Sequence, residues 1–310
     1  MIEFCGLRLA HPIINGSGTF DAIAARRAFG DALLDDFPFS AFVSKTITLA
    51  PRAGNPPPRL WEAQAGMINS IGLPNRGLDG YLEHDLPQLA ALPVPLITNV
   101  MGSSADEVAR LVETVDARDE VAAIELNVSC PNVRTGLDIG ADPVSLAALV
   151  RAVRPLTRKP LIVKLTPNTA DVAAVAVAAE DEGADAISLI NTLRAMALEP
   201  GCGRPWLGGG TGGLSGPAVR NIAIAQVAAV ARRVAVPVVG MGGVADGTHA
   251  KDLISVGASL VAVGTENFRD PRAGSRIAAE LKSLQIAGSP STSMNASEPR
   301  PEVDANWVDS

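Results

Sequence analysis

The sequence predicts a TIM (β/α)8 barrel, an α/β fold, with inserted loops over its C-terminal face. The chain of 310 residues is close to the roughly 250 residues plus insertions of one such barrel. It contains eight short runs that are almost continuously hydrophobic, as are parallel strands covered on both faces. Segments with a helical apolar period separate many of these runs. A flat doubly wound sheet remains the alternative architecture.

The eight expected strands consist mainly of aliphatic residues, and eight is the number of strands in this type of barrel. In chain order they are Pro12–Asn15, Ala41–Thr46, Pro95–Val100, Ala123–Ser129, Leu161–Thr166, Ala186–Asn191, Pro237–Gly242 and Leu260–Thr265.

The expected helices between these strands begin at recognisable residues. Asp142 followed by Pro143 is a helix start, because aspartate caps free N–H groups and proline is tolerated in the first turn. Apolar residues then recur at helical spacing. The same pattern predicts helices over Ala105–Val115, Asp171–Glu182 and Ala218–Arg232.

Residues 1–286 are expected to form one barrel domain without a second core. Two connections, Ala50–Gly80 and Leu193–Gly216, are much longer than the others, and long ordered loops are more often functional than idle. Residues 287–310 have no hydrophobic period and are rich in serine, proline and acidic residues. This composition predicts a disordered C-terminal tail.

Composition and charge narrow the classes of function. The net charge of −7 disfavours a nucleic-acid partner, since such proteins usually carry a basic surface. No stretch reaches the roughly 20 apolar residues that span a bilayer, and the first residues lack the pattern of a signal peptide. We therefore expect a cytoplasmic protein with no membrane contact. The spacing of Cys5, Cys130 and Cys202 favours reduced thiols over disulfides or a metal site.

Polar side chains follow most of the predicted strands, at the edge where parallel α/β folds bind ligands. Lysine or asparagine stands at five of the eight ends, which turn formation alone does not explain. These residues are Lys45, Asn99, Asn127, Lys164 and Asn191.

Cys130 is the residue that points most directly to catalysis. A single cysteine is more often an inert buried side chain. Here Asn127 and Asn132 flank the thiol, and Pro131 ends the strand directly after it. Because a buried amide costs free energy unless it is paired, two amides beside a thiol predict a ligand that all three contact.

Two further groups of residues predict the chemistry of that ligand. The loop Asn69–Asn75 and the pair Asn191-Thr192 add amides, so that the set fits a ring rich in carbonyl and N–H groups, such as uracil. Gly240–Gly243 and Gly264-Thr265 stand where such barrels bind phosphate. Taken alone, each segment could be an ordinary turn. The lysines at two strand ends need a negative partner if they are directed into the barrel mouth, whereas lysines on the surface would not.

Four motifs in this order resemble class 1 dihydroorotate dehydrogenases, and most closely the B type. They are N-S-I-G-L-P-N over Asn69–Asn75, N-V-S-C-P-N over Asn127–Asn132, G-G-L-S-G-P-A over Gly212–Ala218 and G-M-G-G over Gly240–Gly243. The resemblance runs from about residue 2 to residue 270, and the combination of motifs is what makes it specific. Two small departures, Ala195 for glycine and Asn15-Gly16 for a Pro-Ala pair, leave the catalytic positions intact.

The resemblance implies an FMN-dependent enzyme that oxidises (S)-dihydroorotate to orotate in pyrimidine (UMP) biosynthesis. Cys130 is the implied base for the C5 proton, while a hydride passes from C6 to flavin N5; Lys45 is the second implied catalytic residue. Because a free thiol has a pKa of about 8.5, we expect an alkaline activity optimum. The residues implied to bind substrate are Lys45, Asn69, Ser70, Ile71, Gly72, Leu73, Asn127, Asn132, Asn191 and Thr192.

The resemblance also implies the residues that hold FMN. Lys164 is implied to lie beside the N1 and O2 edge of the flavin, where negative charge develops on reduction. The full set is Gly18, Thr19, Lys45, Thr46, Asn99, Asn127, Lys164, Ile190, Gly216, Gly242, Gly243, Gly264 and Thr265.

The resemblance leaves the electron acceptor open. B-type relatives pass electrons to NAD through a second subunit that carries FAD and an iron–sulfur cluster, whereas A-type relatives work alone and reduce fumarate. This chain has neither a dinucleotide fingerprint nor a set of cluster cysteines, so such cofactors must come from a partner. A homodimer is implied as well.

Three other interpretations compete. The pyrimidine-reducing domain of dihydropyrimidine dehydrogenase is similar and also places a cysteine over FMN, but its substrate lacks the carboxylate that Lys45 and the loop Asn69–Leu73 are expected to bind. The acidic charge disfavours a dihydrouridine synthase. Cys130 and the lysines at strand ends disfavour a ligand-binding barrel without catalysis.

Overall fold

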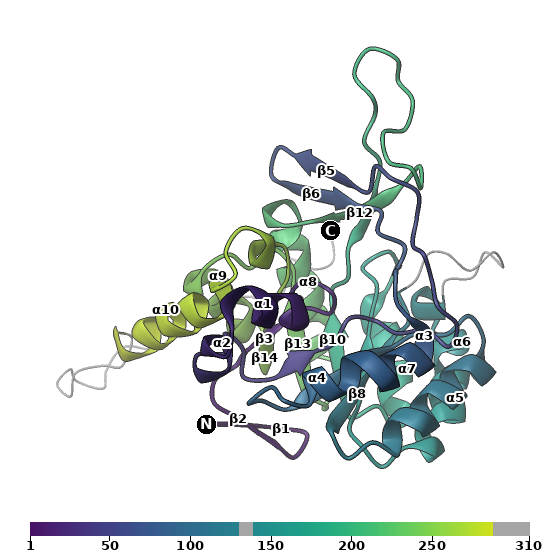
Figure 1. The fold of residues 1–310 in the computed structure, drawn as a ribbon, viewed down its shortest axis with the longest axis vertical. Coiled ribbons are helices and arrows are strands. Elements are labelled where there is room, and N and C mark those ends of the chain that lie inside the picture. The colour runs from purple at the N-terminus through teal and green to yellow at the C-terminus, as the bar shows by residue number, and fades with distance from the viewer. Residues whose placement is uncertain (130–138, 288–310) are drawn as a thin grey trace, which may run out of the picture.

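A computed structural model describes residues 1–129 and 139–287, and its main feature is a nearly closed barrel of eight parallel strands (Figure 1). Each predicted apolar run overlaps one strand, so the barrel prediction is confirmed over the flat alternative. The neighbouring strands, in order, are β3 (Ile13–Asn15), β14 (Leu260–Val263), β13 (Val238–Met241), β10 (Ala186–Leu189), β9 (Leu161–Lys164), β8 (Val121–Asn127), β7 (Leu96–Val100) and β4 (Phe42–Val43).

Helices occupy the connections between successive strands and surround the barrel (Figure 1). The predicted start at Asp142 is correct, because its side chain accepts a hydrogen bond from the backbone N–H of Ser145. Hydrogen bonds from the hydroxyl and then from the backbone N–H of Ser145 lower the pKa of Asp142. The helices are α1 (Ala22–Phe29), α2 (Ala32–Asp35), α3 (Gly77–Gly80), α4 (Leu86–Leu89), α5 (Ala105–Asp116), α6 (Pro143–Val153), α7 (Val172–Asp181), α8 (Arg220–Ala231), α9 (Gly247–Ser255) and α10 (Ala273–Ala287).

An N-terminal hairpin closes the bottom of the barrel. It consists of β1 (Ile2–Phe4) and β2 (Leu7–Leu9), which pair antiparallel. The buried side chains of Phe4 and Leu9 pack with the apolar residues that line the barrel interior. The ligand side of the barrel is therefore the opposite end, where the strands terminate.

The two long connections form a second, antiparallel sheet, which the sequence did not predict. Its strands, in spatial order, are β11 (Leu193–Ala195), β12 (Gly212–Ser215), β6 (Gly66–Asn69) and β5 (Leu60–Ala63). The central pairing joins Gly213 to Asn69, so that loops separated by more than a hundred residues become one structure. Figure 1 shows this second sheet at the end of the barrel where the parallel strands terminate.

The barrel closes between β3 and β4 through a side chain. No ladder joins these two strands in the described part of the chain. Instead, Asn15 Nδ2 donates to the carbonyl of Val43 at 2.8 Å, and Asn15 Oδ1 accepts from the N–H of Val43 at 2.8 Å. The carboxamide of Asn15, which is fully buried, thus takes the place of a peptide group on a neighbouring strand.

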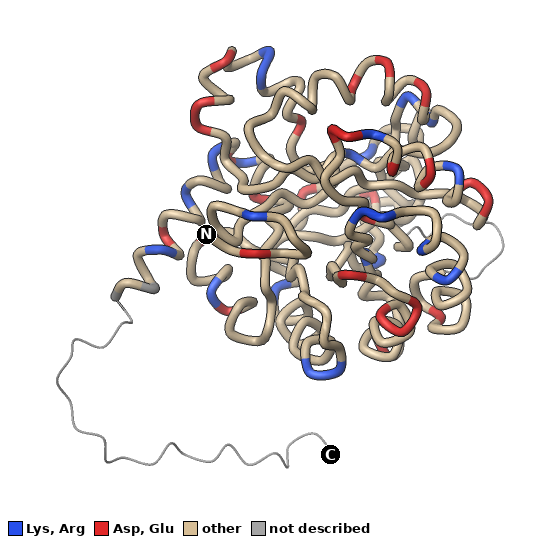
Figure 2. The backbone as a smooth tube through the Cα atoms, turned by 90° about the horizontal axis from the view of Figure 1, so that it is seen from below, with Lys and Arg blue, Asp and Glu red and all other residues tan. Residues whose placement is uncertain are grey.

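Charges of both signs are distributed over the helices and loops (Figure 2). Within residues 1–129 and 139–287, no helix is long and apolar enough to cross a membrane. The predicted tail lies outside the described residues from residue 288 onward.

Replacing Asn15 with alanine should lower the free energy of unfolding by roughly 3 kcal/mol, because the N–H and C=O of Val43 would be left buried without partners. Urea denaturation followed by circular dichroism measures this change. Asn221→Ala is the matched control, since Asn221 is exposed on α8, and it should change stability by less than about 0.5 kcal/mol. Equal stability of the two variants would contradict the role given to Asn15.

Candidate active site

The barrel interior changes from apolar to polar along the strand direction. The apolar interior cluster includes Ile97, Ala123, Ile162 and Ala186. Two residues further along the same strands, and therefore on the same face, is a buried set that we call the polar layer. The polar layer consists of Asn99, Glu125, Lys164 and Ser188.

Glu125 organises the polar layer by accepting two hydrogen bonds. Asn99 Nδ2 donates to Glu125 Oε1 at 2.5 Å, and Ser188 Oγ donates to Glu125 Oε2 at 2.9 Å. With its amide nitrogen held by Glu125, Asn99 directs its Oδ1 elsewhere. That oxygen is buried and has no hydrogen-bond partner among the residues described. Because an unpaired buried acceptor costs free energy, Asn99 Oδ1 fits a donor group on a ligand.

Lys164 brings a positive charge into this layer. Its side chain ends β9, next to β8, and is 5% exposed. Within the described ranges, its ammonium has no acidic oxygen within ion-pair distance. Removing an ammonium from water is costly, and an anionic ligand would offset that cost.

The ends of β3, β4 and β8 meet at the rim of the barrel. Asn127 Nδ2 donates to Thr46 Oγ1 at 3.3 Å, and the hydroxyl of Ser17 donates to the carbonyl of Ser44 at 2.8 Å. Gly18 has a positive φ of 72°, and a Cβ placed on it would lie 3.8 Å from Lys45 Cγ. The structure therefore brings these sequence-predicted residues to one place.

Glycines from three segments approach one another closely beside them, and we call this group the glycine cradle. Gly243 has a φ of +71°, and a Cβ there would lie 2.7 Å from Arg220 Cβ and 3.0 Å from the carbonyl oxygen of Gly216. Gly216 in turn approaches Thr265, since its Cβ would lie 3.5 Å from Thr265 Cγ2. The glycine cradle consists of Gly216, Gly242, Gly243, Gly264 and Thr265.

The glycine cradle has the chemistry of a phosphate site. Thr265 is the first residue of a short 3-10 helix, Thr265–Phe268, and the first N–H groups of a helix have no partner within it. Side chains on Gly242 or Gly243 would clash with α8 or with Ile190, so the backbone there stays bare. A bare backbone near a helix start favours an anion with several acceptor oxygens. Thr19 borders the same site, because Gly264 lies against its Cγ2.

A cavity of about 480 Å³ lies between the barrel rim and the second sheet. Its walls are mainly amide side chains and glycine backbone. Eight of the residues expected to bind substrate line it, namely Asn69, Ser70, Ile71, Gly72, Leu73, Asn127, Asn191 and Thr192.

The other predicted substrate and catalytic residues are placed differently. Lys45 is exposed at the rim and does not line this cavity. Cys130 and Asn132 lie outside the described residues, although Ser129, directly before Cys130, lines the cavity. Cys5 belongs to the opposite end of the barrel, where burial, followed by the charge of Asp185, raises the pKa of its thiol to about 11. The exposed Cys202 follows β11 in the chain.

Sequence reasoning missed several residues of the site. Asn55, Asn168 and Arg194 line the cavity, and Asn168 Nδ2 donates to the carbonyl of Thr192 at 3.0 Å. Asn55 and Arg194 lie in the two long connections that were recognised only as functional loops. Glu125 carried a readable signal, because it is the only acidic residue in the eight apolar runs.

The matches to known proteins cover most of the chain and name one family. The family model described as dihydroorotate dehydrogenase matches residues 1–284. The protein named "Dihydroorotate dehydrogenase B (NAD(+)), catalytic subunit" from Geobacter metallireducens is 44% identical over 289 residues, which cover 92% of each chain. Proteins with the same name from Geobacter sulfurreducens and Desulforudis audaxviator are 44% and 45% identical over 285 residues, covering 91% of this chain and of each relative.

Replacing Glu125 with leucine should lower the free energy of unfolding by roughly 2 kcal/mol or more, because Asn99 Nδ2 and Ser188 Oγ would lose their buried acceptor. Glu125→Gln is the matched control. Its amide oxygen can still accept from Asn99, and its amide nitrogen can donate to the serine hydroxyl. Thermal or urea unfolding should therefore rank wild type, glutamine and leucine in that order, and a leucine variant as stable as wild type would contradict this account.

Proposed function

The chain belongs to the dihydroorotate dehydrogenase family, and on this premise we propose that it oxidises (S)-dihydroorotate to orotate with bound FMN. The family is flavin-dependent and acts in pyrimidine biosynthesis. The observation that carries the proposal is the cavity of about 480 Å³, whose amide-rich wall lies beside the polar layer with its buried Lys164 and beside the glycine cradle. A planar ring with carbonyl and N–H groups matches the cavity, and a flavin phosphate matches the cradle.

The residues present fit FMN on two observations. Asn99 Oδ1 is a buried acceptor that lacks a donor among the described residues, and the flavin ring carries an N–H group. The glycine cradle supplies bare backbone where a phosphate needs several donors. Gly18, Thr19, Lys45, Thr46, Asn127 and Ile190 would complete the surroundings of the cofactor.

The cavity supports a substrate that combines a pyrimidine ring with a carboxylate. Asn69, Asn127 and Asn191 would pair with the carbonyl and N–H groups of the ring, because amides both donate and accept. The backbone of the segment Ile71–Leu73, where Gly72 and Leu73 have positive φ, would meet the carboxylate. Lys45 is exposed at the rim outside the cavity lining, and its side chain would have to turn inward to meet the same group. Asn132 and Thr192 are proposed to contact the ring as well.

The reaction removes one proton and one hydride from the substrate. When bound, FMN supplies the acceptor for the hydride from C6. Cys130, as the thiolate, would take the proton from C5, so that two electrons leave the ring with the hydride and a C=C bond forms. Lys164 would stabilise the negative charge that the flavin gains on reduction. Its ammonium is buried in the polar layer, where such stabilisation is strong.

The electron acceptor follows from the names of the relatives. Because these relatives are called NAD(+) enzymes and catalytic subunits, we propose that this chain passes its electrons to NAD through a separate partner subunit. The sequence has three cysteines, too few to ligate an iron–sulfur cluster of the four-cysteine type, so an FAD and iron–sulfur centre would belong to the partner. A homodimer of this chain would form the core of the assembly. No observation favours fumarate as the acceptor.

The uracil-reducing alternative gains no support. The matched family and the relatives cited above are all named dihydroorotate dehydrogenases. The substrate side of the cavity also contains Arg194, a positive charge that a ring without a carboxylate would not require.

Anaerobic mixing of the purified, flavin-loaded protein with dihydroorotate should bleach the visible absorbance of the oxidised flavin. Stopped-flow spectroscopy measures the rate, and dihydrouracil, which lacks the carboxylate, is the matched control and should leave the spectrum unchanged. A yellow, folded protein that dihydroorotate does not reduce would contradict the proposed reaction. Reduction by dihydrouracil alone would favour the uracil-type alternative.

Cys130→Ser should slow this reduction by about 100- to 10 000-fold, the range typical of losing a general base, while FMN stays bound. The wild-type rate should rise with pH as the thiol ionises, since only the thiolate accepts a proton. Cys202→Ser is the control, because Cys202 is exposed and does not line the cavity, and it should react like wild type. An unchanged rate and pH profile in Cys130→Ser would rule out the thiol as the base.

A further inference from the structure

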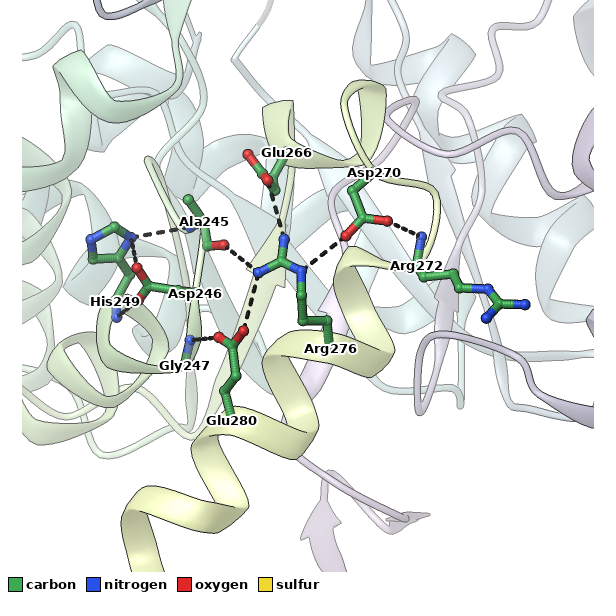
Figure 3. Close-up of polar contacts among 9 residues, drawn as sticks. All are labelled: Ala245, Asp246, Gly247, His249, Glu266, Asp270, Arg272, Arg276 and Glu280. Carbon is green, nitrogen blue, oxygen red and sulfur yellow. Dashed lines mark hydrogen bonds and ion pairs between the residues drawn. The ribbon is translucent and has the colours of Figure 1, made fainter.

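One arginine outside the site contacts residues that closely follow two segments of the glycine cradle. Arg276 lies on α10, and Figure 3 shows its guanidinium at the centre of a cluster of polar groups. Its Nη1 donates to the carbonyl of Ala245 at 3.0 Å, and its Nη2 donates to Glu266 Oε1 at 3.1 Å. Ala245 follows Gly243 by two residues, and Glu266 follows Thr265 directly. The guanidinium therefore bridges the loop after β13 and the short helix after β14.

Acidic side chains fix the guanidinium in this position. Asp270 Oδ2 accepts from Arg276 Nε at 2.9 Å, and Glu280 Oε1 accepts from Nη1 at 3.3 Å. Because Arg276 is held from several directions, its planar fork has little freedom to swing toward solvent. The side chain is still 37% exposed, so its substitution leaves no large buried hole.

Glu280 extends the same cluster to the start of α9. Its Oε2 accepts from the N–H of Gly247 at 2.7 Å. A Cβ on Gly247 would lie 2.6 Å from Glu280 Cβ and 2.6 Å from the backbone nitrogen of Leu281. α10 therefore packs directly on the end of the loop that begins at Gly242, and the contact depends on a glycine.

We propose that Arg276 is a positioning residue for the flavin phosphate. It touches neither cofactor nor substrate in this scheme, but it sets the spacing between Gly243 and Thr265, whose N–H groups would converge on one phosphate. A phosphate needs these donors at hydrogen-bond distance simultaneously, and a shift of a few tenths of an ångström weakens each contact. The inference rests on the proposed FMN site.

The test compares FMN with riboflavin, which has the same ring but no phosphate. Apoprotein is titrated with each flavin, and binding is followed by quenching of flavin fluorescence. Arg276→Gln should raise the dissociation constant for FMN by about tenfold, the effect of one charge-assisted hydrogen bond, and leave that for riboflavin unchanged. Arg276→Lys should give an intermediate value, because it keeps the charge but has a single nitrogen in place of the three that contact separate groups.

Arg272→Gln is the matched control. Arg272 is exposed four residues away, and its side chain points away from the cluster (Figure 3), so both flavins should bind as to wild type. An unchanged dissociation constant for FMN in Arg276→Gln would overturn the inference, and so would an equal loss of affinity for FMN and riboflavin. If Arg276→Gln does not fold, an Arg276→Lys variant that binds FMN like wild type would overturn it. Failure of the wild-type apoprotein to bind either flavin would instead refute the proposed cofactor, and this inference with it.

Discussion

Eight strands can close into a barrel only if the two strands at the ends of the spatial order, β3 and β4, also satisfy each other's backbone groups. The side chain of Asn15 meets this requirement. Its two 2.8 Å hydrogen bonds with Val43 replace a ladder between β3 and β4. Closure at this point places the loop after β3 against the loop after β4, where Ser17 bonds the carbonyl of Ser44. The rim that is proposed to hold the flavin therefore depends on the same contact that completes the barrel. The asparagine that departs from the family pattern at this position has a structural role.

The interior of the closed barrel is divided into an apolar lower part and a polar upper part. Phe4 and Leu9 from the hairpin are buried against the apolar side chains of the lower end. The upper end contains Glu125 and Lys164, and burying either charge is costly unless it is paired or hydrogen-bonded. Glu125 is satisfied within the protein, whereas Asn99 Oδ1 is not satisfied among the described residues. A site that binds a cofactor tightly is expected to have buried polar groups without a hydrogen-bond partner, because the bound ligand supplies the partner that the protein does not.

The parts of the fold that the sequence predicted are those encoded by local pattern. Continuous apolar runs gave the eight strands, and Asp142 before Pro143 gave the start of α6. The second sheet escaped prediction because β11 and β12 are only three and four residues long, and β12 begins with two glycines, so that neither has an alternation to detect. Their pairing with β6 depends on tertiary proximity. The site shows the same difference between local and tertiary information. Motif residues such as Asn69 and Asn191 line one cavity, as predicted. Asn168 and Arg276 were missed because their contacts join segments that are far apart in sequence.

The charges near the glycine cradle indicate that phosphate binding there depends on the spacing of N–H groups and not on long-range attraction. The cluster at α10 contains Glu266, Asp270 and Glu280 but a single guanidinium, so its summed charge is negative. Such a cluster repels a phosphate at long range, although solvent screening weakens the repulsion beyond roughly 8–10 Å. Binding of the phosphate must then come from short N–H contacts, which require correctly spaced loops. An arginine neutralised by three carboxylates is poorly suited to bind phosphate directly, but it is well suited to hold those loops at a fixed distance.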